Sequence, residues 1–157
     1  ATLVLATLVF LAALAFAQPK PNFSGTWKQD NAKSTFAKLP VPISVTDIIT
    51  HKDPVLHLTQ TVVGPQGDSV TSEHDYSTDG REQTGKSRNY TEKTAVKWDG
   101  DALIFTNTRD YSGREVIIRE RWELSSDGKI LTKERFSPFS KGSTKAEVKQ
   151  IFVLEKQ

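Results

Sequence analysis

Runs rich in valine, isoleucine, threonine and aromatic residues recur along the chain, and in many of them apolar and polar positions alternate. Such alternation is typical of β-strands that bury one face. Hairpin-favouring turns separate the runs, at 64–67, Asp79-Gly80, Asp99-Gly100, Ser112-Gly113, Asp127-Gly128 and Lys141-Gly142. The pattern predicts strands at residues 23–29, 44–51, 55–63, 69–77, 81–87, 89–98, 102–111, 114–124, 130–138 and 145–155.

This succession of strands indicates an all-β fold. Antiparallel strands joined by tight turns form an up-and-down meander, and closing the meander into a barrel of about eight to ten strands removes its exposed edges. A flatter two-sheet sandwich is the alternative. One short helix is expected near the N-terminus at residues 31–37, followed by a proline-bearing loop at 38–42 that crosses one end of the barrel.

The first seventeen residues carry no charge and end in the small-residue pattern Ala15-Phe16-Ala17. We interpret residues 1–17 as a secretory signal segment that is cleaved after Ala17, and residues 18–157 as a single β-barrel domain. An uncleaved membrane anchor is the alternative, although a membrane span needs about 20 residues. The expected location is the periplasm or the medium outside the cell.

The charge distribution of the chain argues against polyanionic binding partners. The chain has 21 basic and 19 acidic residues, a net charge of +2, and no block of one sign, which argues against nucleic acid or an anionic membrane surface as partner. There is no cysteine, so the fold relies on its core. We expect a monomer or a weak homodimer with no membrane span after signal cleavage; Ile104 and Ile117, on the outer face, mark a candidate dimer contact.

Two-residue turns at Asp99-Gly100 and Ser112-Gly113 set an expected register for three central strands. They pair Val96 with Leu103 and Leu103 with Trp122, and they place apolar residues on one common face. Charged and polar residues share that inward face. The candidate ligand-binding residues are Tyr90, Glu92, Phe105, Asn107, Arg109, Ile118, Glu120 and Trp122.

Charges at inward positions need partners. Arg109, which the expected register sets opposite Tyr90, either holds a carboxylate-bearing ligand or neutralises Glu92. Glu120 faces Glu134 or Arg135, depending on the length of the next hairpin loop. Like charges opposite each other are unfavourable, so we favour the pairing of Glu120 with Arg135.

The segment Phe23 to Lys28 contains a Gly-x-Trp pattern, Gly25-Thr26-Trp27, just after the apolar N-terminal run. With the β-meander that follows, it resembles the lipocalin-like barrels of the calycin group, particularly small exported bacterial ones. The resemblance implies a barrel that holds a small, often hydrophobic molecule, with Trp27 packed across a closed end. Unlike classical lipocalins, the chain ends in a predicted strand, and ten strands are more similar to fatty-acid-binding proteins.

The sequence contains no recognisable motif for catalysis or for metal binding. There is no nucleophile elbow, thiol or glycine-rich phosphate loop, and the carboxylates Glu92 and Glu120 are a weak candidate for acid–base work, so we expect no enzyme activity. His57 faces His74 in only one of two registers and has no third ligand, so we expect no metal and no cofactor. The leading hypothesis is binding of a small hydrophobic or amphipathic molecule, anionic ones included. A packed interaction or structural module is its alternative.

Overall fold

The computed structural model describes residues 19–37, 39–86, 89–138 and 147–157. They form ten strands, and every predicted strand is present with its ends shifted by no more than two residues. The strands are β1 (Gly25–Gln29), β2 (Ser44–Lys52), β3 (Val55–Val63), β4 (Ser69–Ser77), β5 (Asp79–Lys86), β6 (Thr91–Asp99), β7 (Ala102–Asp110), β8 (Glu115–Leu124), β9 (Ile130–Pro138) and β10 (Glu147–Lys156). The predicted signal segment, residues 1–17, lies outside the described residues.

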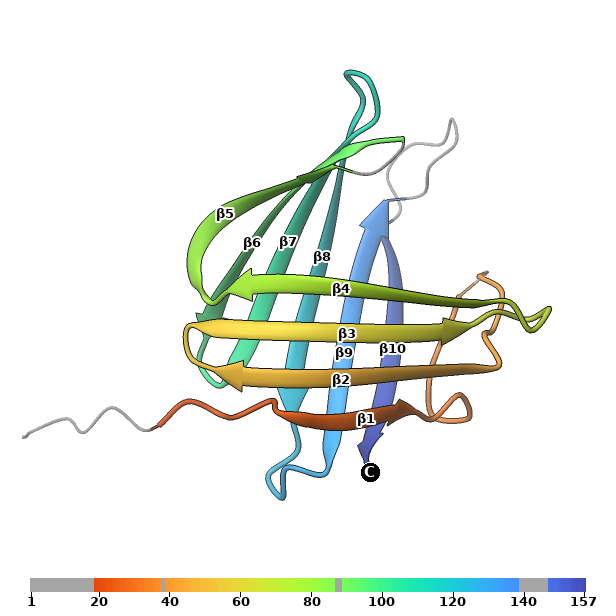
Figure 1. The fold of residues 1–157 in the computed structure, drawn as a ribbon, viewed down its shortest axis with the longest axis vertical. Helices are drawn as coiled ribbons and strands as arrows, with labels where there is room; N and C mark the ends of the chain where they lie inside the picture. Colours follow the sequence, from red (N-terminus) through yellow and green to blue (C-terminus); the bar gives the residue numbers. More distant parts are fainter. Residues whose placement is uncertain (1–18, 38, 87–88, 139–146) are drawn as a thin grey trace, which may run out of the picture.

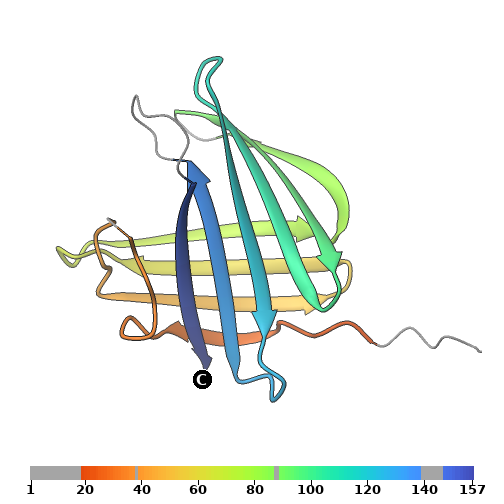
Figure 2. The ribbon, with the colours of Figure 1, turned by 180° about the vertical axis from the view of Figure 1, so that it is seen from behind.

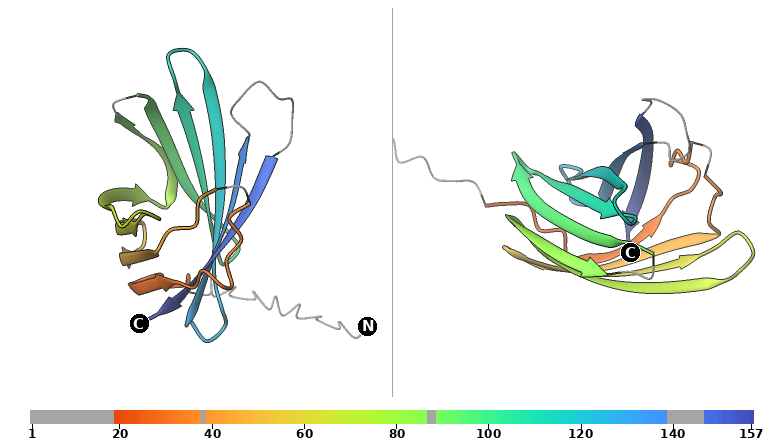
Figure 3. Two further views of the ribbon diagram at one scale, coloured as in Figure 1. Left: turned by 90° about the vertical axis from the view of Figure 1, so that its right-hand side faces the viewer. Right: turned by 90° about the horizontal axis from the view of Figure 1, so that it is seen from above.

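The strands form one antiparallel sheet in the order β4-β3-β2-β1-β10-β9-β8-β7-β6-β5. Figure 1 shows β1–β4 running across β6–β10 at a steep angle, and Figure 2 shows the second group from the opposite side. The sheet therefore folds back on itself into two walls, which the side and top views separate (Figure 3). The pairing of β1 with β10 joins the walls, while β4 and β5 are the ends of the hydrogen-bonded order, so the barrel is nearly closed.

The hairpin between β7 and β8 has the predicted register. Leu103 pairs with Trp122, and the backbone N–H of Tyr111 donates to the carbonyl of Arg114 at 3.0 Å. Ser112 and Gly113 have φ of 56° and 93°, as a type I′ turn requires at its two central residues. Turn chemistry alone therefore located this hairpin.

The predicted register between β6 and β7 is wrong by two residues. Val96 pairs with Phe105 rather than Leu103, and Glu92 lies directly opposite Arg109. The turn is centred on Gly100 and Asp101; Gly100 has φ of 60°, as expected for the first central residue of a type II′ turn, whereas the prediction made it the second. A shift of two preserves the period of the strand, so the predicted inward face is retained.

The expected helix at 31–37 is absent, and the described part of the chain contains no helix. Asp30 Oδ1 instead accepts the backbone N–H of Ala32 at 2.9 Å, which turns the chain. The backbone N–H of Thr35 then donates to the carbonyl of Ile151 at 2.7 Å. These bonds hold the segment against β10 in place of helical hydrogen bonds. Among the described residues, no helix is long and apolar enough to cross a membrane.

The hydrophobic core packs around Trp27, which is 0% exposed. Its indole N–H donates to the carbonyl of Phe23 at 3.0 Å, so the buried ring keeps its polar atom satisfied. The surrounding buried cluster includes Phe23, Ile49, Leu56, Leu58, Val96, Leu103, Phe105, Trp122, Leu131 and Leu154. Trp27 has the buried position that the Gly-x-Trp resemblance implied.

His51 is buried beside this core with a side chain only 2% exposed. Its Nδ1 accepts the backbone N–H of Phe23 at 3.3 Å, and its ring lies 5.8 Å from the Phe23 ring and 5.9 Å from Trp98. Its Nε2 lies 3.9 Å from the Asp53 carboxylate and has no hydrogen-bond partner among the described residues. Burial lowers the pKa of His51 below its ordinary value, and the Asp53 charge only partly opposes this.

Stability should therefore fall when the solution is acidified below the ordinary histidine pKa of 6.5. The unfolded chain takes up the proton more readily than the folded one, so the contribution of neutral His51 is complete above that pH and is lost as pH falls toward the folded pKa. Urea unfolding at about pH 7.5 and about pH 5.5 measures this. His51→Asn, whose amide oxygen can replace Nδ1, should reduce the pH dependence; an equal dependence in both proteins would contradict it.

Candidate functional site

A cavity of about 530 Å³ lies between the two walls. This volume is within the range of pockets that enclose small molecules. Strands of both walls line it, and Phe36, Leu39, Pro40 and Pro42 of the segment between β1 and β2 contribute to one side. The predicted proline-bearing loop thus borders the hollow, although it contains no helix.

Seven of the eight candidate residues predicted from the sequence line this cavity, namely Tyr90, Glu92, Phe105, Asn107, Arg109, Glu120 and Trp122. Ile118 does not. It is half-buried and borders a separate hollow with Tyr111 and Val116, near the hairpin between β7 and β8. The predicted face therefore continues past the end of the cavity.

Aromatic rings form the apolar surface of the cavity. The Phe105 ring lies 4.3 Å from Trp122 and meets Tyr76 edge-on at 5.2 Å, centroid to centroid. Tyr76 in turn stacks on His74 at 5.9 Å. Phe105 and Trp122 come from β7 and β8, whereas Tyr76 comes from β4, so the rings span the two walls. Burial raises the pKa of the Tyr76 hydroxyl well above its usual value, so the hydroxyl stays neutral.

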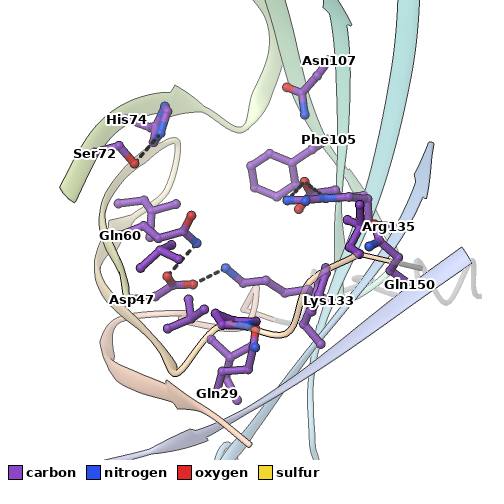
Figure 4. Close-up of a pocket in the computed structure, with 18 of the residues that line it drawn as sticks. Gln29, Asp47, Gln60, Ser72, His74, Phe105, Asn107, Lys133, Arg135 and Gln150 are labelled. Atoms are coloured by element: carbon purple, nitrogen blue, oxygen red, sulfur yellow. Dashed lines mark hydrogen bonds and ion pairs between the residues drawn. The ribbon is translucent and has the colours of Figure 1, made fainter. Parts of the chain in front are cut away.

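An ion pair joins the walls inside the barrel. Lys133 Nζ on β9 donates to Asp47 Oδ2 on β2, and both side chains point into the space between the walls (Figure 4). Asp47 is 0% exposed and the Lys133 side chain 6%. Gln60 Nε2 donates to the other Asp47 oxygen at 2.9 Å, and Lys133 Nζ lies 3.6 Å from the centroid of the Trp122 ring. The carboxylate and the ammonium are thus both compensated.

Glu120 and Arg135 form a second interior pair, in the register that the sequence favoured over Glu134. Arg135 Nε and Nη2 both lie 2.8 Å from Glu120 Oε1, and the Trp122 indole N–H donates to Oε2 at 3.0 Å. Burial alone would raise the pKa of Glu120, but the Arg135 charge and these hydrogen bonds hold it below its ordinary value. Glu120 is therefore ionised, and each of its two oxygens accepts at least one hydrogen bond.

Arg109 pairs with Glu92, which is one of the two roles considered for it. Its Nε lies 3.3 Å from Glu92 Oε2, and its guanidinium lies 4.9 Å from the centroid of the Tyr90 ring. Burial works to lower the pKa of Arg109, but Glu92 and Tyr90 raise it above its usual value. The guanidinium is thus held as a cation beside its carboxylate.

Uncharged polar groups complete the lining. The Thr94 hydroxyl donates to Asn107 Oδ1 at 2.8 Å, and both residues are buried. Gln150 Nε2 donates to the carbonyl of Phe36 at 3.3 Å and ties β10 to the segment that borders the cavity. These amides fix the interior without adding charge.

The histidines do not meet. His57 pairs with Asp75 at 2.7 Å, while His74 lies opposite Leu58 and faces the cavity. This is the alternative register of the hairpin between β3 and β4. Within the described ranges, no three His, Cys, Asp or Glu side chains are grouped so that they could hold a metal ion.

Sequence reasoning missed Asp47, Gln60 and Lys133. Alternation in β2 does reveal Asp47 as inward, because Val45, Asp47 and Ile49 are all buried. Its partner could not be found in the same way. β2 and β9 are not neighbours in the sheet, since β1 and β10 lie between them, so hairpin register says nothing about contacts across the barrel.

The sequence matches no known family model and no curated protein. Solved structures do match. Secretory abundant heat soluble protein 4 from Ramazzottius varieornatus has a TM-score of 0.62 at 14% identity, covering 90% of this chain and 99% of that chain. Zebrafish ileal bile acid-binding protein has a TM-score of 0.54 at 15% identity, covering 86% and 98%.

A third match is a mutant of a fatty acid transporter, REP1-NXSQ. It has a TM-score of 0.53 at 12% identity and covers 86% of this chain and 98% of that chain. The three proteins share with this chain a barrel of the same architecture, whereas their sequences differ at most positions. The ten-stranded meander, its nearly closed shape and these matches together show that this chain has the fold of a lipocalin-like β-barrel.

Proposed function

We propose that the protein binds one small hydrophobic or amphipathic molecule in the cavity between its walls. The observation that carries the proposal is the cavity itself, about 530 Å³ lined by the Phe105, Trp122 and Tyr76 rings. Small-molecule sites commonly combine such an apolar surface with a few fixed polar groups. A uniformly packed structural module would fill this space with side chains.

Two matching structures support the same proposal. The zebrafish protein is a bile acid-binding protein complexed with cholic acid, and REP1-NXSQ is described as a fatty acid transporter. Both are binding or transport proteins rather than enzymes. We extend to this chain only the apolar character of those ligands, because the aromatic rings and aliphatic side chains that line its cavity can cover an apolar body.

The proposed setting is outside the cytoplasm. The uncharged run at residues 1–17 and its small-residue ending support export and cleavage after Ala17. N-terminal sequencing of protein recovered from cultures tests this. A mature chain beginning at Gln18 supports the proposal, and an intact run in the membrane fraction would contradict it.

Filling the cavity should weaken ligand binding. Val62 of β3 lines the cavity, so Val62→Trp places an indole in the space that the ligand occupies. We expect the uncharged dye Nile red to bind the parent protein and to bind Val62→Trp at least about tenfold more weakly, a change of about 1.4 kcal/mol. Fluorescence titration measures both affinities.

The matched control is Val55→Trp on the same strand. Val55 is 59% exposed and does not line the cavity, so this variant should bind Nile red like the parent. Equal binding by parent and Val62→Trp would place the dye on the surface. No binding by the parent would refute the proposed function.

A further inference from the structure

Resting on the proposed function, we infer that the cavity selects an amphipathic ligand with an uncharged polar head group, such as a long-chain alcohol, over the matching carboxylate or ammonium. The selection arises from the charge balance of the cavity wall. Three carboxylates, two arginines and one lysine line the cavity, together with the imidazole of His74, which is hydrogen-bonded to Ser72. Each carboxylate is paired with one arginine or lysine: Asp47 with Lys133, Glu92 with Arg109, and Glu120 with Arg135.

A ligand carboxylate would have to displace one of these internal carboxylates or enter as an unbalanced charge. Displacement is opposed at Arg135, whose Nε and Nη2 both engage Glu120 Oε1. Trp122 fixes the second Glu120 oxygen. Freeing Glu120 would thus leave a buried carboxylate without its cation, which is strongly unfavourable.

Lys133 is no more available to an anion. Its ammonium donates to Asp47 and lies against the Trp122 ring, and Asp47 is completely buried. Removing Lys133 from Asp47 would leave that carboxylate with Gln60 alone. Binding of a ligand ammonium is also unfavourable, because each cavity carboxylate already has a cationic partner that the ammonium would have to displace.

Two uncharged amides of the cavity wall can still form hydrogen bonds with a ligand. Thr94 occupies Asn107 Oδ1, so the Asn107 amide nitrogen remains as a donor without a partner among the described residues. Gln60 uses its nitrogen on Asp47, so its oxygen remains as an acceptor. Figure 4 shows both amides at the border of the open space. An uncharged hydroxyl or amide head group can use either group without disturbing an ion pair.

The test is displacement of Nile red from the parent protein at neutral pH by 1-dodecanol, dodecanoate and dodecylammonium, which share one chain and differ in charge. We expect the alcohol to displace the dye at a concentration at least about tenfold lower than either ion. Equal or tighter binding of an ion, or no displacement by the alcohol, overturns the inference while dye binding leaves the proposed function standing. Failure of the parent to bind the dye refutes the proposed function itself.

Charge variants test the cause. Glu120→Gln leaves Arg135 without its carboxylate, so the affinity ratio of dodecanoate to dodecanol should rise at least about tenfold. Glu134→Gln is the matched control, because Glu134 pairs with Lys149 at 3.0 Å and does not line the cavity; its ratio should equal that of the parent. Should Glu120→Gln fail to fold, Glu92→Gln provides the test, because it frees Arg109 by changing a more exposed carboxylate, 23% exposed against 11% for Glu120. An unchanged ratio in the folded variant overturns the inference.

Discussion

Replacement of Trp27 by alanine should lower the free energy of unfolding by about 3 to 5 kcal/mol. The indole is completely buried, and the substitution removes its packing against the core and its hydrogen bond to the carbonyl of Phe23. The backbone of β1 is paired on both sides, with β2 and β10, so the sheet has little freedom to collapse into the space. Urea unfolding followed by circular dichroism measures the loss.

A surface substitution in another strand provides the comparison for Trp27. Ile117 is exposed on β8, and Ile117→Ala should change stability by no more than about 0.5 kcal/mol. A loss below about 1 kcal/mol for Trp27→Ala would show that Trp27 does not hold the core together. The structural reason for its position in the Gly-x-Trp pattern would then be lost.

Replacement of Lys133 by methionine should also cost about 3 to 5 kcal/mol, because it leaves the Asp47 charge buried without a cation. Methionine keeps most of the length of the aliphatic stem, so lost packing is a minor part of the change. The double variant Asp47→Leu/Lys133→Met removes both charges and should recover most of the stability. Chemical unfolding of the single and double variants measures the interaction between the two residues.

An exposed ion pair gives the contrast. Lys149→Met breaks the pair with Glu134 and should cost less than about 1 kcal/mol, since water replaces the lost partner. If Lys133→Met were as mild as Lys149→Met, Asp47 would not depend on Lys133. If the double variant were no more stable than Lys133→Met, lost packing rather than the orphaned charge would explain the cost.

The strands were predictable because a half-buried strand imposes a period of two, and glycine marks most of its turns. Ser112-Gly113 has left-handed φ at both residues, and the register there was correct. The Asp99-Gly100 turn was placed one residue early, because the glycine there is the first central residue of the turn and not the second. An Asp-Gly dipeptide thus shows where a turn lies, but it does not fix the pairing register of the two strands that the turn joins.

The helix prediction failed for a different reason. The segment 31–37 has no strong strand pattern, but its fate depends on β10, whose Ile151 backbone bonds to Thr35. Such a contact joins residues far apart in the sequence and leaves no local signal. Tertiary hydrogen bonds therefore overrode a weak local preference.

In the candidate site too, contacts within a hairpin could be predicted from the sequence, whereas contacts across the barrel could not. Register within hairpins correctly predicted that Glu120 faces Arg135 and placed Phe105 and Trp122 on the inward face. Contacts across the barrel, such as Asp47 with Lys133, depend on how the sheet folds back on itself. Period-two patterning tells which face a residue occupies, and the three-dimensional closure decides which residue it meets there.

That closure gives the barrel its two interior properties, an aromatic hollow and a wall whose charges cancel. The hollow supports binding of an apolar body, and the paired charges support an uncharged head group. Exposed apolar residues elsewhere, including Val70 on β4 and Ile117 on β8, could bind a hydrophobic ligand on the outer surface instead of in the cavity. Where the ligand sits is therefore as informative as how tightly it binds.

Nuclear Overhauser contacts between a bound dodecyl ligand and isotope-labelled protein test the central claim most directly. We expect contacts from the ligand chain to the ring protons of Phe105, Trp122 and Tyr76, which line the cavity from both walls. The tightest-binding of the three dodecyl compounds serves as the ligand, so the result does not depend on its head group. Contacts confined to exposed residues such as Val70 and Ile117, or no contacts at all, would contradict binding inside the barrel.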